Sequence, residues 1–136
     1  MSEENVEIAR RVLDAWNRRD IQGFLALCDP ELEFVNSPTA VEPGTRRGSD
    51  EIAAVLRTQW EILLDARQEV DRTYDRGDEI LVLGRISRRM PESEARIEDR
   101  YLSSIRIRDG TVVRIEMVGV GAAEVQEGLN AAGLTE

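Results

Sequence analysis

The spacing of apolar residues changes near residue 66, and this change constrains the fold more than any other feature of the sequence. Before it, apolar residues recur every three or four positions, as on one face of a helix; after it, they follow the period of extended strands. Helices followed by a run of antiparallel strands are typical of the α+β class. We therefore expect helices packed on one face of a curved sheet, with a concave apolar pocket between them that suits a small ligand.

Three helices are predicted in the first half of the chain. Residues 4–18 place their apolar side chains on one helical face. Asp20 can cap a second, short helix that runs to residue 27. A cap at Ser49 or Asp50 predicts a third helix that ends near residue 64.

Extended segments account for most of the remaining chain. Residues 31–35 alternate like a strand, and residues 36–47 hold two prolines and a glycine, which predicts a loop. Four further strands are predicted over residues 67–74, 79–89, 96–107 and 112–118, with an Asp-Gly hairpin turn before the last. Residues 122–132 are predicted to form a short helix or an ordered extension.

The chain has 136 residues, which suits one domain spanning residues 1–136. No stretch reaches the roughly 18 apolar residues of a membrane span, and the first residues lack the features of a signal peptide. We therefore expect a cytoplasmic protein that binds no membrane. The single cysteine, Cys28, has no partner for an internal disulfide and lies in an apolar run, which favours a structural role.

All 18 basic residues are arginine, and the chain has neither lysine nor histidine. Schiff-base chemistry and histidine-activated nucleophiles are therefore excluded, so a general base must be Asp, Glu or Tyr. We expect no cofactor and no metal, although a carboxylate site for magnesium or calcium stays open. The net charge of −9 disfavours nucleic acid as a partner.

Six short motifs follow one another along nearly the whole chain: Trp16–Asp20, Leu27–Phe34, Arg47–Ile52, Gly77–Asp78, Arg108–Gly110 and Glu127–Gly133. Their order resembles the nuclear-transport-factor-2-like superfamily and, within it, the SnoaL-like, polyketide-cyclase-like branch. The resemblance implies a cone-shaped antiparallel sheet packed against about three helices, a cystatin-like α+β roll. It also implies a homodimer formed through the convex face of the sheet. It does not specify the activity, because this fold carries many functions.

The resemblance also allows the catalytic positions of two related branches to be compared. The ketosteroid-isomerase set falls on Asn36, Val12 and Ser103. The epoxide-hydrolase set falls on Arg85, Ser87 and Met117, of which only the arginine keeps the residue type of that branch. A histidine of many SnoaL-like relatives falls on Asp29. Both catalytic sets are therefore absent.

Strand alternation predicts which side chains line the pocket. Asp99, Tyr101 and Ser103 should share the inward face of their strand. If the turn to the neighbouring strand centres near Glu92 and Ser93, we expect Arg85 opposite Tyr101 and Ser87 opposite Asp99, all facing inward. The other predicted ligand-binding residues are Trp16 and Trp60 on the helices, Asn36 at the end of the first strand and Met117 on the last strand.

Two functions fit these predictions. The first is cofactor-independent isomerisation, cyclisation or dehydration of a small apolar compound, with Asp99 as base and Arg85 and Tyr101 as oxyanion partners. The second is a non-catalytic module that binds a small apolar ligand or serves in dimerisation. They differ at Asp99: burial raises the pKa of a carboxylate, whereas an arginine within about 4–6 Å lowers it by about 1–3 units. A salt bridge from Arg85 to Asp99 would therefore favour binding over catalysis.

Overall fold

The computed structural model describes residues 2–38 and 42–135, which form four helices and six strands. The elements of the first half are α1 (Ser2–Asn17), α2 (Ile21–Ala26), β1 (Cys28–Asn36), β2 (Gly44–Arg47) and α3 (Ser49–Ile62). The second half contains β3 (Arg67–Asp75), β4 (Glu79–Arg89), β5 (Arg96–Arg108), β6 (Thr111–Val120) and α4 (Ala122–Ala131).

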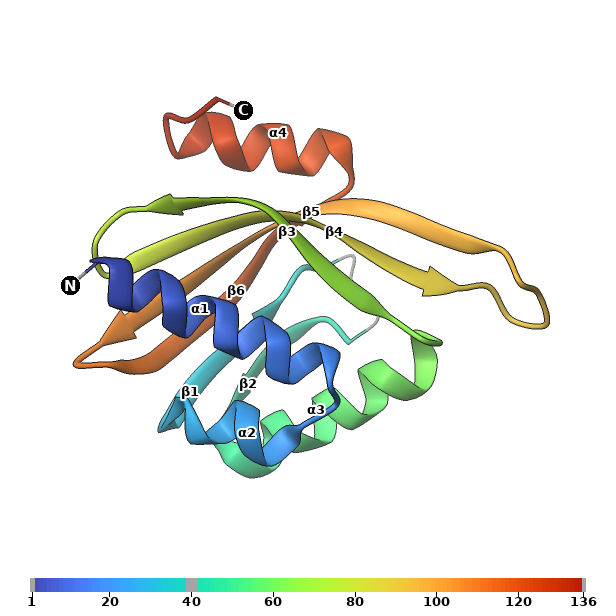
Figure 1. Cartoon of the computed structure of the whole chain (residues 1–136), viewed down its shortest axis with the longest axis horizontal. Coiled ribbons are helices and arrows are strands. Elements are labelled where there is room, and N and C mark those ends of the chain that lie inside the picture. Colours follow the sequence, from blue (N-terminus) through green and yellow to red (C-terminus); the bar gives the residue numbers. More distant parts are fainter. Residues whose placement is uncertain (1, 39–41, 136) are drawn as a thin grey trace.

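The six strands form one sheet in the order β2-β1-β6-β5-β4-β3. Neighbouring strands are antiparallel except β1 and β6, which pair in parallel. The sheet arches over α1, α2 and α3, which lie on its concave side (Figure 1). The predicted α+β class and the curved sheet are therefore confirmed.

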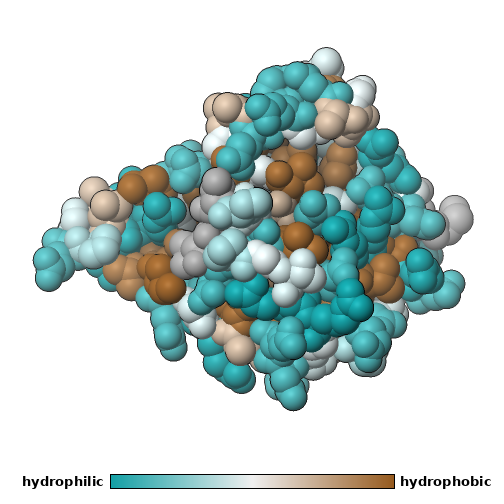
Figure 2. Space-filling view, turned by 180° about the vertical axis from the view of Figure 1, so that it is seen from behind, coloured by the Kyte–Doolittle hydropathy of each residue, from teal (hydrophilic) through white to brown (hydrophobic). Residues whose placement is uncertain are grey.

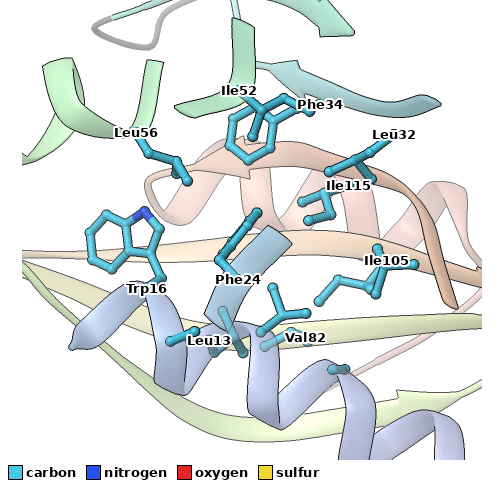
Figure 3. Packing of buried hydrophobic residues seen from close by; sticks show 14 of the residues in the cluster. Leu13, Trp16, Phe24, Leu32, Phe34, Ile52, Leu56, Val82, Ile105 and Ile115 are labelled. Carbon is cyan, nitrogen blue, oxygen red and sulfur yellow. The ribbon is translucent and has the colours of Figure 1, made fainter. Parts of the chain in front are cut away.

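The concave side of the sheet holds the larger apolar cluster. Helix α1 places Ala9, Val12, Leu13 and Trp16 in this cluster, as its spacing predicted. Figure 3 shows the labelled side chains of α1, α2, α3 and the sheet pointing toward one shared interior. Helix α2 begins as predicted, because the Asp20 carboxylate accepts a hydrogen bond from the Gly23 amide at 2.9 Å.

The convex side of the sheet is partly covered by α4, so the prediction that helices pack on one face only was wrong (Figure 1). Val125 and Leu129 of α4 are fully buried in a second apolar cluster with Leu81, Leu83 and Leu102 of the sheet. Residues 122–132 were predicted to form a short helix or an ordered extension; they form α4, and that prediction did not indicate which face of the sheet the segment covers.

An edge strand and the start of one helix differ from the sequence prediction. Residues 44–47 form the edge strand β2 inside the predicted loop 36–47, of which residues 39–41 lie outside the described part of the chain. This strand is short and mostly exposed, so it has no apolar alternation to detect. Helix α3 starts at Ser49 after Gly48, whose φ is 87°, and neither Ser49 nor Asp50 caps it.

Candidate functional site

A cavity of about 310 Å³ lies between the concave face of the sheet and the helices. Its walls are mainly apolar and come from α1, α2, the α3 region and the five strands β1, β3, β4, β5 and β6. The apolar lining residues are Val12, Leu13, Trp16, Phe24, Phe34, Leu63, Ile86, Ile105, Ile115, Met117 and Val120. The polar lining residues are Asn36, Gln59, Gln68, Arg88, Asp99 and Ser103.

Five predicted site residues line this cavity: Trp16, Asn36, Asp99, Ser103 and Met117. The structure brings them together from α1, β1, β5 and β6. The other four predicted residues, Arg85, Ser87, Tyr101 and Trp60, do not line the cavity.

Arg85 and Ser87 face away from the cavity, so their predicted inward placement was wrong. In the observed register Arg85 pairs with Arg100, and Ile86 pairs with Asp99. The predicted register differed by one residue, and a one-residue shift moves every side chain of a strand to the opposite face. On the convex face Arg85 forms ion pairs with Asp71 at 2.9 Å, Glu69 at 3.0 Å and Glu98 at 3.5 Å.

The same register turns Arg88 inward, and sequence reasoning did not select it. Its guanidinium lies 3.9 Å from the Asp99 carboxylate, and each side chain is about 40% exposed. These two residues are the only charged ones among the described residues that line the cavity. The turn is centred between Glu92 and Ser93, close to the predicted centre, but this centre pairs Arg89 with Arg96 and so turns Arg88 inward in place of Arg85.

Tyr101 points to the concave side but is sealed in the wall and does not line the cavity. Its ring lies across Gly84, where a Cβ atom would come within 2.9 Å of the ring and 2.3 Å of the Glu69 carbonyl oxygen. Only glycine therefore fits beneath this ring. Burial raises the pKa of Tyr101, and its hydroxyl has no hydrogen-bond partner among the described residues. A direct contact between this hydroxyl and a ligand is not available in this arrangement.

Ser103 is 5% exposed and lines the cavity two residues further along β5. Its hydroxyl also lacks a hydrogen-bond partner among the described residues. The residues paired with it across the sheet are Val82 and Met117, which offer no side-chain hydrogen bond. Ser103 is therefore a buried polar group directed at apolar space.

Trp16 is part of the helical wall of the cavity, and its ring packs against that of Trp60. The two rings lie 6.0 Å apart at an angle of 59°, and the guanidinium of Arg19 lies over both, at 5.7 Å and 5.9 Å from their centres. Trp16 Nε1 donates a hydrogen bond to the Gln59 side chain at 3.3 Å. Trp60 was predicted to bind ligand; it supports Trp16 and does not line the cavity.

Asn36 is buried where β1 ends, and its side-chain amide donates to the Glu42 carbonyl at 2.7 Å. This bond links the end of β1 to Glu42, which lies shortly before β2. Gln68, at the start of β3, is held by Asn17, which exchanges two hydrogen bonds of 2.8 Å with its backbone. Both lining amides are thus positioned by backbone contacts.

Within residues 2–38 and 42–135, no three His, Cys, Asp or Glu side chains come together in a way that could hold a metal ion. In the same part of the chain, no helix is long and apolar enough to cross a membrane.

A family model of the SnoaL-like domain matches residues 9–115. The fold is also similar to solved structures. An NTF2-like protein of unknown function from Burkholderia pseudomallei is 24% identical, with a TM-score of 0.74 and coverage of 83% of this chain and 88% of that one. TerC, co-crystallised with polyporic acid, is 22% identical, with a TM-score of 0.73 and the same coverage.

A putative polyketide cyclase from Sinorhizobium meliloti is 21% identical, with a TM-score of 0.66 and coverage of 82% of this chain and 93% of that one. At these identities the similarity shows a common fold. A search of curated proteins gave no match.

Proposed function

Because the chain belongs to the SnoaL-like domain family and has its NTF2-like fold, we propose that it binds a small, largely apolar organic molecule in the cavity on the concave side of the sheet. The observation that carries this proposal is the cavity itself. It is apolar on most sides, with a few polar groups directed into it, which is the usual composition of a small-molecule site.

The size of the cavity and the residues of its walls restrict which ligands fit. Its volume of about 310 Å³ is at the lower end of the roughly 300–1,000 Å³ typical of ligand pockets. Trp16, Phe24 and Phe34 contribute aromatic surface from three different elements (Figure 3). Aromatic walls favour a flat ring system, which they contact through stacked or edge-to-face geometry. The complex of TerC with polyporic acid supports a small organic ligand in this fold.

A naphthalene dye tests binding directly. Anilinonaphthalene sulfonate should bind the folded protein with a stoichiometry of one, measured by isothermal titration calorimetry. Val120→Phe places a ring in the cavity and should weaken binding at least tenfold. Val118→Phe is the matched control, because Val118 lies on the convex face beside α4. Equal binding by both variants and the wild type would place the dye elsewhere and contradict the proposal.

Acid–base catalysis on the bound molecule is a second candidate, favoured by one observation. Asp99 is the only carboxylate among the described residues that line the cavity, and Arg88 beside it can stabilise a developing oxyanion. Arg88 thereby takes the role that the sequence assigned to Arg85. Catalysis rests on this one half-exposed pair, whereas binding rests on the whole lining of the cavity, so binding is the primary proposal.

Proton exchange on an enolisable aromatic ketone separates the two candidates. In deuterated buffer, a catalytic protein should incorporate deuterium next to the carbonyl of tetralone, followed by NMR, and Asp99→Asn should abolish the gain over buffer. Arg85→Gln, on the convex face, should leave the rate unchanged. No exchange above the buffer rate would contradict catalysis of this kind and leave the binding proposal standing.

A further inference from the structure

The polar groups of the cavity lie at two separate places. Ser103 is almost fully buried, whereas the side chains of Arg88 and Asp99 are about 40% exposed and mark the rim. Asp99 and Ser103 are four residues apart on the same face of β5, which corresponds to about 13 Å along a strand. A ligand that contacts both places must carry a polar group at each end.

Ser103 determines which polar group the ligand can carry at its inner end. Its hydroxyl is buried, lines the cavity and has no hydrogen-bond partner among the described residues. A buried hydroxyl without a partner is costly and uncommon in folded proteins. A hydroxyl or carbonyl on the ligand would supply the missing hydrogen bond, whereas a charged group would lose its hydration in this apolar region.

Arg88 determines which polar group the ligand can carry at the rim of the cavity. Its one ion pair within the described residues, to Asp99 at 3.9 Å, is longer than a hydrogen bond, so its N–H groups have room for another acceptor. Arg85, the neighbouring arginine on the opposite face, already has three carboxylate partners. The planar guanidinium of Arg88 suits a carboxylate, which can accept two parallel hydrogen bonds.

The charge near the rim decides between an anionic and a cationic ligand group. Arg88 and Asp99 compensate each other, and Arg19 adds a further positive charge behind Trp16, with no carboxylate in ion-pair distance among the described residues. Arg19 thus adds a positive charge beside the lining residue Trp16, although the whole chain carries −9. Salt at physiological strength screens charges beyond about 8 Å, so the local groups dominate for a bound ligand.

We infer that the ligand is an anion that binds with its charged group, such as a carboxylate, at Arg88 on the rim, and with a neutral hydroxyl or carbonyl hydrogen-bonded to Ser103 inside the cavity. This inference rests on the proposed binding function and specifies its ligand class. With Asp99 marking the position of the adjacent Arg88 guanidinium, the strand spacing to Ser103, less one hydrogen bond of about 2.8 Å at each end, leaves about 7 Å between the two polar groups. Two fused aromatic rings can span this distance.

Four naphthalene probes test the inference: naphthoate, the hydroxynaphthoate with its hydroxyl on the far ring, naphthol, and naphthylmethylamine. Binding is measured by quenching of Trp16 fluorescence in a Trp60→Phe background, since Trp16 lines the cavity and Trp60 does not. The hydroxynaphthoate should bind about 5- to 10-fold more tightly than naphthoate, the effect of one added hydrogen bond. The amine should bind more weakly than naphthoate.

Two variants assign the two contacts. Ser103→Ala should remove the advantage of the hydroxynaphthoate and leave the affinity for naphthoate unchanged. Arg88→Gln should weaken both carboxylates about tenfold and leave naphthol unchanged. Arg85→Gln is the matched control on the opposite face and should change none of these affinities. Circular dichroism and thermal unfolding of each variant verify that it is folded.

The outcomes separate the inference from the function on which it rests. Tighter binding of the amine, or an unchanged hydroxynaphthoate advantage in Ser103→Ala, would overturn the inference while the cavity remains a binding site. Equal weakening of all four probes by Arg88→Gln would overturn the charge contact in the same way. Failure of every probe to bind the wild-type protein would contradict the proposed function itself.

Discussion

Among single residues, Tyr101 combines complete burial with an unpaired hydroxyl. Replacing a buried polar group that lacks a partner with an apolar group of the same shape removes a desolvation cost. We therefore predict that Tyr101→Phe raises the free energy of unfolding by about 1 kcal/mol.

Urea unfolding monitored by circular dichroism measures this change. Tyr74→Phe is the matched comparison, because the Tyr74 hydroxyl donates a hydrogen bond to the Thr135 carbonyl at 3.2 Å. That variant should lose about 1 kcal/mol. A clear loss of stability in Tyr101→Phe would show that its hydroxyl has a partner, such as a buried water. A loss of ligand binding without a loss of stability would restore its predicted role in the site.

Cys28 gives the stability of the protein a dependence on alkaline pH. Burial raises the pKa of its thiol from 9.0 to about 12, and the thiol donates a hydrogen bond to the Phe24 carbonyl. Between these pH values the unfolded chain loses the proton and the folded chain keeps it, so the free energy of unfolding should fall as the pH rises. The contribution is fully present below pH 9.0.

Cys28→Ser removes this titration and should reduce the fall in stability across the same pH range. Chemical unfolding at several pH values measures the two slopes. The slope should not vanish, because burial also raises the pKa of Tyr101. Identical slopes in the two proteins would contradict a buried, protonated thiol. A protonated thiol is a poor nucleophile, which agrees with the structural role expected for Cys28.

The sequence predicted part of the site, and its main error occurred at one strand. Alternation placed Asp99 and Ser103 on the correct face of β5, because period-two spacing is a local property. Arg85 was selected in place of Arg88 because the pairing of β4 with β5 was counted one residue away from its true register, and a shift of one residue reverses the faces of a strand. The ring of Tyr101 lies over Gly84 and requires glycine at that position. No spacing rule indicates such a contact.

At the scale of elements, α4 connects to the sheet through a small set of apolar contacts. Leu129 is fully buried against the convex face, in the cluster that contains Leu81, Leu83 and Leu102. We predict that Leu129→Ala lowers the free energy of unfolding by about 2–5 kcal/mol, since it leaves a cavity between helix and sheet. Binding of naphthalene probes at low temperature should stay unchanged, because the cavity lies on the other face.

Thermal unfolding and calorimetric titration of the same variant test both parts of this prediction. Asn130→Ala, an exposed neighbour on α4, should change neither quantity appreciably. A loss of ligand affinity in Leu129→Ala with the protein still folded would show that α4 controls the shape of the cavity. That result would contradict the independence of the two faces.

Most element boundaries followed from periodicity, and the exceptions have a common cause. Helix α1, strand β4 and the hairpin turn before β6 were predicted because their patterns are set by neighbours in the sequence. Strand β2 and the position of α4 depend on contacts with distant residues. Such contacts leave no local pattern, so the sequence alone did not indicate them.

At the scale of the whole molecule, the homodimer through the convex face stays a prediction. Helix α4 already covers the apolar part of this face. The part over β1 and β6 carries ion pairs, such as Arg114 with Glu33 and with Glu116, both at 2.8 Å. Figure 2 views the molecule from behind and does not look onto the convex face; the surface that it shows is mostly hydrophilic, with apolar areas separated by polar ones. A dimer that uses the ion-paired area would therefore depend on electrostatic contacts.

Sedimentation velocity at low and at high salt tests this expectation. Salt screens exposed charges, so the dimer fraction should fall as salt rises. Arg114→Glu places a third negative charge beside Glu33 and Glu116 and should give a monomer at all salt concentrations. A dimer that survives both treatments would use another surface, and a monomer under every condition would contradict the dimer.

The two faces of the sheet have different roles. The concave side keeps space open, whereas α4 fills the convex side with close-packed side chains. Substitutions that reshape the cavity usually reduce stability, and here that loss can be offset by changes that never touch the ligand. The ligand selectivity of the concave face and the stability supplied by the convex face can therefore evolve, or be engineered, separately.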